Sequence, residues 1–214
     1  LPRQLLAGAQ YALFRTGPLT STAITAGAFI RSDPLLERPD IQINMFSWSA
    51  MERTSEEVIP HPFPAFTMSP VHLRPDCDGS VRIKSPDPLA PPAISYEFLR
   101  SPYDQQAILH GMRVCRQIAN QPALSRYMVE EVVPGPTVAS DEELLADVRA
   151  RGIANYHPVG TCRMGDALDS ATDARLRVHG IDGLRVADAS VMPSIIAGNT
   201  NAPTIMIGEK AAAM

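Results

Sequence analysis

The chain has 214 residues, 45% of them hydrophobic and 20% charged, which is enough to bury a sizeable core. Its net charge of -4 gives no indication of binding to nucleic acid or to anionic membranes. Three widely spaced cysteines favour reduced thiols over a disulfide framework, so we expect a cytoplasmic protein, with peripheral membrane attachment left open.

The first half of the sequence predicts an opening helix, then strands joined by proline-rich connections. Apolar residues between positions 5 and 13 recur at helical spacing, and Gly17-Pro18 ends this helix. The polar segment 51–64 is expected to be a surface loop, either an ordinary solvated one or a substrate lid. Pro70 indicates either that its strand lies at a sheet edge or that the strand is broken there. The expected strands are a short buried one at 26–31, a half-buried one at 41–46, and others at 66–73, 79–84 and 93–98.

The second half predicts more helix. Asp104 can cap a helix that carries an apolar stripe, and the capping box Ser140-Asp141-Glu142-Glu143 opens another that ends near Gly152. Residues 177–179 and 184–187 look like short strands, and 204–213 like a final helix. Strands gathered early, with helices between and after them, predict an α+β fold with a largely antiparallel sheet.

Two runs near the C-terminus hold the candidate catalytic residues. In the run 155–165, His157 stands between Tyr156 and Pro158, and in the run 183–204 a strand leads to the loop Asn199-Thr200-Asn201. Proline and glycine fix backbone direction, so we expect His157 and Asn201 to point from defined turns. A neutral imidazole suits a general base, and an amide can donate a hydrogen bond to a developing oxyanion.

Each of these residues also has a structural interpretation. A single His-Pro in a loop is more often structural than catalytic, and Asn199 is read as a turn or capping residue. Asp188 could cap loop amides or lie near a cofactor. Cys162 is expected to be a small packed residue. The other histidines lack metal-ligand spacing, so no metal site is predicted.

Several patterns are missing from the sequence. It has no G-x-G-x-x-G fingerprint and no P-loop, since Asp166 follows Gly165 where a P-loop needs lysine. No apolar run approaches the length of a membrane-spanning helix. The start shows no signal-peptide pattern, although a chain that begins at Leu1 is compatible with a leader removed earlier. The sequence therefore predicts no phosphate-binding loop of its own.

Together, in this order, the runs 155–165, 183–193 and 199–204 resemble the C-terminal half of a glucose–methanol–choline (GMC) oxidoreductase. The stretches 17–31 and 73–88 are similar to the family's substrate domain, although Cys77-Asp78 departs from the usual serine-arginine pair. The likeness covers nearly the whole chain.

The resemblance implies a function. GMC enzymes are flavoproteins that oxidise alcohols by transferring hydride from the carbinol carbon to N5 of FAD. The base histidine of the family corresponds to His157 and the second catalytic position to Asn201. Asp188 and Ala189 match the segment near the ribityl and pyrophosphate part of FAD. The backbone near the pyrimidine end of the flavin corresponds to Asn201, Ala202, Pro203 and Thr204.

The same resemblance implies an architecture. Residues 1–152 correspond to a substrate-binding domain, and residues 153–214 to a segment that completes an FAD-binding α/β domain. The ADP-binding fingerprint of the family lies upstream, so we expect the N-terminal part of the same protein to be the natural partner. The isolated chain is expected to bind no FAD, and its uncovered apolar faces could form a homo-oligomer.

Three functions remain open from the sequence. The first is oxidation of a primary alcohol, whether choline-like, aliphatic or aromatic, to an aldehyde. The second is a hydroxynitrile lyase on the same scaffold, with His157 in acid–base cleavage. The third is a truncated, non-catalytic module. The sequence names neither the alcohol nor the electron acceptor.

Overall fold

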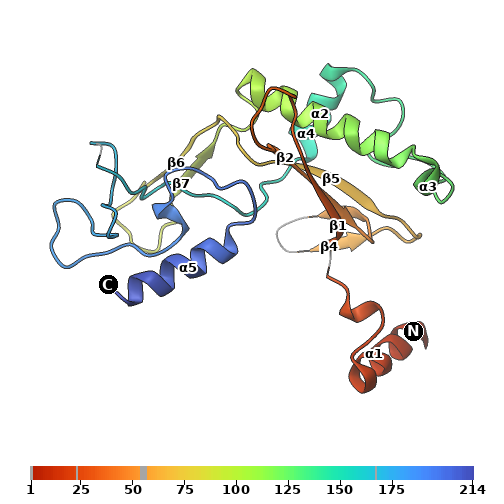
Figure 1. Ribbon diagram of the computed structural model, residues 1–214, viewed down its shortest axis with the longest axis horizontal. Coiled ribbons are helices and arrows are strands. Elements are labelled where there is room, and N and C mark those ends of the chain that lie inside the picture. The colour runs from red at the N-terminus through yellow and green to blue at the C-terminus, as the bar shows by residue number, and fades with distance from the viewer. Residues whose placement is uncertain (1, 23, 54–56, 167) are drawn as a thin grey trace.

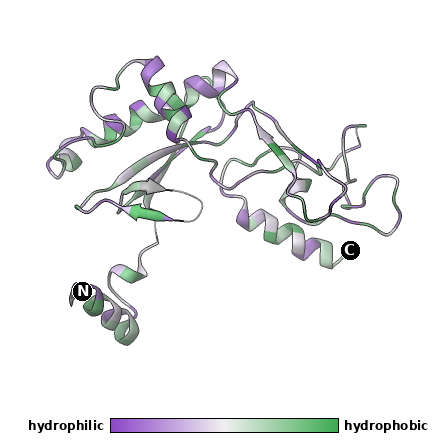
Figure 2. Cartoon of the chain, turned by 180° about the vertical axis from the view of Figure 1, so that it is seen from behind, coloured by the Kyte–Doolittle hydropathy of each residue, from purple (hydrophilic) through white to green (hydrophobic). Residues whose placement is uncertain are grey.

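The computed structural model describes residues 2–22, 24–53, 57–166 and 168–214. A small antiparallel sheet carries helices on one side, the C-terminal part lies beside it, and helix α1 stands apart from both (Figure 1). The same separation of α1 is seen from behind (Figure 2). The helices are α1 (Pro2–Phe14), α2 (Pro102–Ala119), α3 (Pro122–Ser125), α4 (Asp141–Arg151) and α5 (Asn201–Ala212), with the 3-10 turns η1 (Pro18–Thr20) and η2 (Ala189–Val191).

Within the described residues, the strands form three antiparallel units. The largest is a three-stranded sheet in the order β1-β2-β5, and the pairs β3-β4 and β6-β7 form two-stranded sheets. The strand bounds are β1 (Ile24–Ile30), β2 (Ile41–Phe46), β3 (Ala50–Arg53), β4 (Val58–Pro60), β5 (Thr67–His72), β6 (Gly79–Arg82) and β7 (Ala93–Tyr96). The predicted α+β class with a largely antiparallel sheet is confirmed.

The core of the sheet lies between β2 and α2. Ile41 and Ile43 of β2 pack with Ala107 and Cys115 of α2. Gly111 permits α2 to lie close to the sheet, because a Cβ at that position would lie 2.6 Å from the Cβ of Pro70 on β5 and 3.3 Å from the Cγ2 of Ile41 on β2. Side chains of the helix and the sheet therefore exclude water from one face of the sheet.

Two burial predictions for this sheet were wrong. The strand β1, expected to be buried, is mostly exposed because it forms an edge of the sheet. The strand β2, expected to be half-buried, is buried at each position from Ile41 to Asn44 because it is the central strand. On the face away from α2, Gln42 donates a hydrogen bond to Asn44 over 2.9 Å. By contrast, β5 lies at the other edge and pairs with β2 through Pro70, so of the two alternatives predicted from Pro70 the structure has the sheet edge and not the break.

Two further predictions are corrected by local structure. The segment 51–64, expected to be a loop, contains most of the hairpin β3-β4, although residues 54–56 lie outside the described part. The cap of α2 is Ser101, whose hydroxyl accepts from the backbone N–H groups of Tyr103 and Asp104. Asp104 is instead a buried residue of the first turn that accepts a hydrogen bond from the Asp76 backbone N–H over 2.9 Å.

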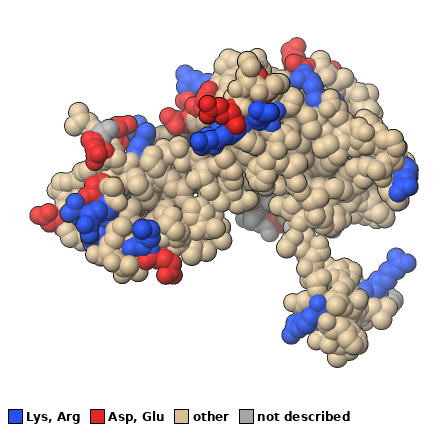
Figure 3. Space-filling view, in the orientation of Figure 1, with Lys and Arg blue, Asp and Glu red and all other residues tan. Residues whose placement is uncertain are grey.

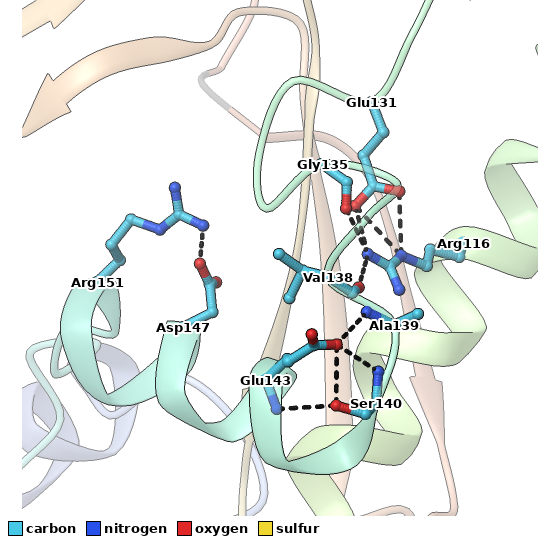
Figure 4. A network of polar contacts seen from close by, with 9 residues as sticks. All are labelled: Arg116, Glu131, Gly135, Val138, Ala139, Ser140, Glu143, Asp147 and Arg151. Carbon is cyan, nitrogen blue, oxygen red and sulfur yellow. Dashed lines mark hydrogen bonds and ion pairs between the residues drawn. The ribbon is translucent and has the colours of Figure 1, made fainter.

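The loop between α3 and α4 is held by one arginine (Figure 4). Arg116 binds both carboxylate oxygens of Glu131 and also donates to the carbonyl oxygens of Gly135 and Val138. The predicted capping box then opens α4, with the Ser140 hydroxyl and the Glu143 carboxylate each receiving a backbone N–H of the other residue.

The C-terminal part has little regular structure before α5. The expected strands at 177–179 and 184–187 are isolated bridges between Thr172 and Val178 and between Arg177 and Arg185. The final helix begins at Asn201, three residues before the predicted start at Thr204. A second small core, formed by Leu176, Val191, Met192 and Ile207, holds this part together.

The surface has an uneven distribution of charge. In the view of Figure 3, charged side chains gather over the upper ridge and the C-terminal part, and the broad surface below the ridge is largely uncharged. Helix α1 exposes large apolar side chains, namely Leu5, Leu6, Leu13 and Phe14. In the part of the chain that the structure describes, no helix combines the length and apolarity needed to cross a bilayer.

Candidate active site

The two sequence runs that hold the candidate residues are bonded to each other. The backbone N–H of Cys162 donates to the carbonyl of Ser190 over 3.0 Å, and that of Met164 donates to the carbonyl of Val191 over 2.9 Å. Val159 and Met164 also pack against the second core. The fold therefore places the His157 turn and the segment that leads to α5 in one unit.

His157 lies in a turn with unusual backbone geometry. Tyr156 has a φ of 60° and Gly160 has a φ of 90°, both in the left-handed region. Glycine adopts this region freely, whereas a tyrosine adopts it at a cost, so the surrounding contacts must hold Tyr156 in place. The imidazole of His157 is half-buried between this turn and the start of α5.

Both ring nitrogens of His157 contact the loop before α5. The Nδ1 atom lies 2.9 Å from the Thr200 hydroxyl oxygen, and the Nε2 atom lies 3.0 Å from the side-chain nitrogen of Asn199. Thr200 is buried, whereas Asn199 is exposed. The sequence interpretation of Asn199 as a turn or capping residue missed this contact, and Thr200 was not singled out.

The residues expected near a flavin lie around the first turn of α5. Asn201 and Ala202 open this helix and are exposed, and Pro203 and Thr204 are half-buried. Thr204 donates its backbone N–H and its hydroxyl to the carbonyl of Thr200, over 3.0 and 2.7 Å. The Thr200 side chain makes no capping bond to the helix, so the first-turn N–H groups of Asn201 and Ala202 receive no acceptor from it.

Asp188 caps the short turn η2, which Ala189 opens. One carboxylate oxygen of Asp188 accepts from the backbone N–H of Ser190 over 2.8 Å and also from its hydroxyl. The carboxylate is exposed, so its second oxygen stays open to a further donor. Capping and proximity to a cofactor are therefore compatible at this position.

Comparison with known sequences decides the family. Residues 75–208 match the family described as GMC oxidoreductase. The chain belongs to the GMC oxidoreductases. This assignment confirms the resemblance drawn from the runs around His157 and Asn201.

Curated GMC relatives match the chain along almost its whole length. An alcohol dehydrogenase [acceptor] of Pseudomonas putida is 38% identical over 212 residues, which is 99% of this chain and 38% of that protein. An oxygen-dependent choline dehydrogenase of Citrobacter koseri is 42% identical over 205 residues, which is 96% of this chain and 36% of that protein. The chain thus spans well under half the length of these relatives.

Comparison with a solved structure shows a similar fold. A formate oxidase from Aspergillus oryzae, studied for its FAD modification, matches with a TM-score of 0.84 and 25% identity, over 100% of this chain and 41% of that one. The GMC fold is therefore shared along the whole chain.

Proposed function

We propose that this chain is the C-terminal part of an FAD-dependent enzyme that oxidises a primary alcohol, whether choline-like, aliphatic or aromatic, to an aldehyde. The observation that carries the proposal is the pair of contacts made by His157. Its two ring nitrogens contact consecutive residues of the loop that precedes α5. A histidine held in this way beside a helix start is suited to moving a proton at one defined point.

In this proposal His157 is the general base. Loss of hydride from a carbinol carbon is far easier once the hydroxyl proton is leaving, and a neutral imidazole accepts a proton near neutral pH. The half-buried position of the ring keeps it ordered while leaving an edge for the substrate. When bound, FAD supplies the acceptor for the hydride.

Asn201 is the second catalytic residue of the proposal. Its carboxamide can donate to the developing oxyanion without taking the proton, so base chemistry falls to His157 alone. Asn201 follows the loop that touches His157 and is exposed at the start of α5. The proposal requires the Asn201 carboxamide to reach the substrate oxygen from the start of α5, where it would be the donor and His157 the acceptor.

The start of α5 fits the electron-rich edge of a flavin. Its first-turn N–H groups have no side-chain cap from Thr200, and a helix N-terminus favours negative charge. We assign this edge to the first turn Asn201, Ala202, Pro203 and Thr204, in which the N–H groups of Asn201 and Ala202 are the donors and Pro203 and Thr204 contribute packing. Asp188 and Ala189 are placed along the ribityl and pyrophosphate part.

The proposal also divides the chain and assigns a partner. Residues 1–152 form the substrate-binding domain, and residues 153–214 complete the FAD domain. The partner is the N-terminal part of a longer GMC protein, because the relatives extend well beyond the matched region and α1 exposes apolar side chains that need cover. FAD binding therefore requires that partner.

Two substitutions test this function in the full-length protein, which includes the N-terminal part and carries FAD. With a primary alcohol under anaerobic conditions, the unmodified protein should bleach its flavin. His157→Ala should slow turnover by about a thousandfold, and Asn201→Ala by about a hundredfold. The exposed His179, changed to Ala, is the matched control and should keep its rate. An unbleached flavin together with cyanohydrin cleavage would identify a lyase, and equal rates in all variants would refute both catalytic roles.

A further inference from the structure

A cavity of about 360 Å³ lies where one end of the three-stranded sheet meets the loop that leads to α5. The residues that line it are Phe29, Arg38, Pro39, Arg74 and Ala197. Phe29 belongs to β1, and Arg38 and Pro39 lie just before β2. Arg74 follows β5, and Ala197 lies shortly before α5. The cavity thus connects the proposed substrate-binding domain with the segment that carries the candidate catalytic residues.

The lining of this cavity has two positive charges and no negative charge. In the part of the chain that the structure describes, neither Arg38 nor Arg74 forms an ion pair. The Nε atom of Arg74 is buried and has no hydrogen-bond partner. The neighbouring carboxylate of Asp40 is already occupied by donors from Ser32 and Tyr103. Because a buried donor without an acceptor is costly, the two guanidinium groups call for an anion in the cavity.

The rest of the lining is apolar and indicates which kind of anion fits. Phe29, Pro39 and Ala197 offer carbon surface to a hydrocarbon chain. A planar carboxylate matches the fork of a guanidinium group through two parallel hydrogen bonds. The cavity therefore suits a carboxylate attached to a carbon chain, whereas two uncompensated positive charges would repel a quaternary ammonium group.

The cavity also lies close to the candidate catalytic histidine. Ala197 is two residues before Asn199, whose side-chain nitrogen lies 3.0 Å from Nε2 of His157. Two residues of chain span at most about 7 Å. A substrate with its carboxylate in the cavity can therefore present a hydroxyl to His157 when several carbons separate its two groups.

We propose that Arg38 and Arg74 bind a carboxylate of the substrate, so that the alcohol oxidised is a hydroxy acid whose two groups are several carbons apart. The inference rests on the proposed function and narrows its range of alcohols. It distinguishes this chain from the choline dehydrogenases that it resembles, because choline carries a positive charge. Neither arginine is among the residues that the family resemblance assigns to the site.

Binding of a carboxylate can be measured without turnover. The probe is hexanoate, which has the carboxylate but no hydroxyl, titrated by calorimetry into the full-length protein with FAD bound. Arg74 is half-buried, so Arg74→Gln should weaken binding by about tenfold to a hundredfold. Arg38 is exposed and screened by salt, so Arg38→Gln should weaken it by about threefold. Arg149→Gln, at an exposed position of α4, is the matched control and should leave the affinity unchanged. Equal affinity in the unmodified protein and Arg74→Gln would overturn the proposal.

Kinetics with a matched pair of alcohols test the same site. The acid ω-hydroxyhexanoate and its amide ω-hydroxyhexanamide differ in charge but hardly in shape. In the unmodified protein kcat/KM should favour the acid by about tenfold or more, and Arg74→Gln should remove most of this preference. Arg38→Glu should shift the preference towards the cation ω-aminohexanol, and its exposed position keeps the test available if Arg74→Gln does not fold. Equal kcat/KM for acid and amide in the unmodified protein would refute the proposal.

The alternative occupant of the cavity is an acidic side chain of the N-terminal part. In that case hexanoate would not bind, and Arg74→Gln would lower the thermal stability without changing the ratio of acid to amide turnover. That result would overturn the proposal. If the protein proves not to oxidise alcohols, the proposed function fails while the hexanoate titration still reports on the arginines, so the two failures are distinguishable.

Discussion

Tyr103 donates its hydroxyl to the buried carboxylate of Asp40 over 2.9 Å, and so ties the first turn of α2 to the residue that precedes β2. The backbone N–H and hydroxyl of Ser32 donate to the same carboxylate. The Asp40 backbone also bonds to Ile30 and Leu73, so this one residue joins all three strands of the sheet to α2.

This contact gives a pH-dependent prediction. Burial raises the pKa of Asp40, but the hydrogen bonds from Ser32 and Tyr103 outweigh burial and hold the pKa below its usual value of 3.8. A carboxyl with a lowered folded pKa stabilises the protein above its unfolded pKa, and this contribution is lost as pH falls through the folded pKa. Tyr103→Phe should therefore lower the free energy of unfolding by about 2 kcal/mol at pH 7 and by less near pH 3.

Urea unfolding at both pH values measures this difference. The exposed Tyr127 changed to Phe is the control, since it loses a hydroxyl without a buried acceptor. An equal loss for Tyr103→Phe at pH 7 and pH 3 would show that the ionised carboxylate is not the acceptor that matters.

Gly160 should be intolerant of a side chain. Its φ of 90° is strained for any residue with a Cβ, so Gly160→Ala should destabilise the protein by about 1–2 kcal/mol and displace the turn that holds His157. Gly208 is the matched control: it lies inside α5, with no atom within 4 Å of an added Cβ. Gly208→Ala should stabilise by about 1 kcal/mol. Thermal unfolding would reveal the opposite signs, and a stabilised Gly160→Ala would contradict the turn geometry.

Arg116 should matter far more than its neighbour on α2. It is 26% exposed and binds Glu131 and two carbonyls, so Arg116→Met should cost about 2–3 kcal/mol in unfolding free energy. Arg116→Lys should lose less, since lysine keeps the charge but cannot span the carboxylate and both carbonyls. The exposed pair of Arg113 with Asp141 serves as control, and Arg113→Met should cost under about 1 kcal/mol. Similar losses from both arginines would contradict the assignment.

Cys115 should be unreactive in the folded protein. Burial between α2 and the sheet raises the pKa of its thiol from 9.0 to about 11. Few thiolates then exist at pH 8, and a thiol reagent followed by peptide mass analysis should leave Cys115 unlabelled until urea is added. Since the unfolded chain forms the thiolate first, stability should also fall as pH rises from 9 to 11. Rapid labelling of Cys115 at pH 8 without denaturant would show that the core of the sheet opens.

Local signals predicted what depends on a few neighbouring residues. The capping box at Ser140 predicted the start of α4, and Pro70 narrowed its strand to an edge position or a break, because each effect acts through its own backbone groups. The burial of β2 was misjudged because it depends on which strands flank it and on α2, some sixty residues later. The hairpin β3-β4 was missed because its strands are only four and three residues long and lie in a segment that is polar and rich in proline as a whole.

The candidate site also has features that the sequence predicts and features that it does not. The runs around His157 and Asn201 were recognisable as patterns, but the contacts of Asn199 and Thr200 with the ring were not. Those contacts depend on α5 starting at Asn201 instead of Thr204, which turns Thr200 inward as the residue before the helix. A sequence alone does not tell which of three adjacent polar side chains in a loop faces a histidine 42 to 44 positions away.

The antiparallel bridge between Arg177 and Arg185 closes a short loop. Residues 179–183 at the tip of this loop are exposed and include two glycines with left-handed backbone. Such a tip can accept extra residues without disturbing the chain on either side. A peptide tag or fluorophore grafted there would leave the spacing of His157 and Thr200 unchanged, which makes it a convenient site for immobilising or imaging the protein.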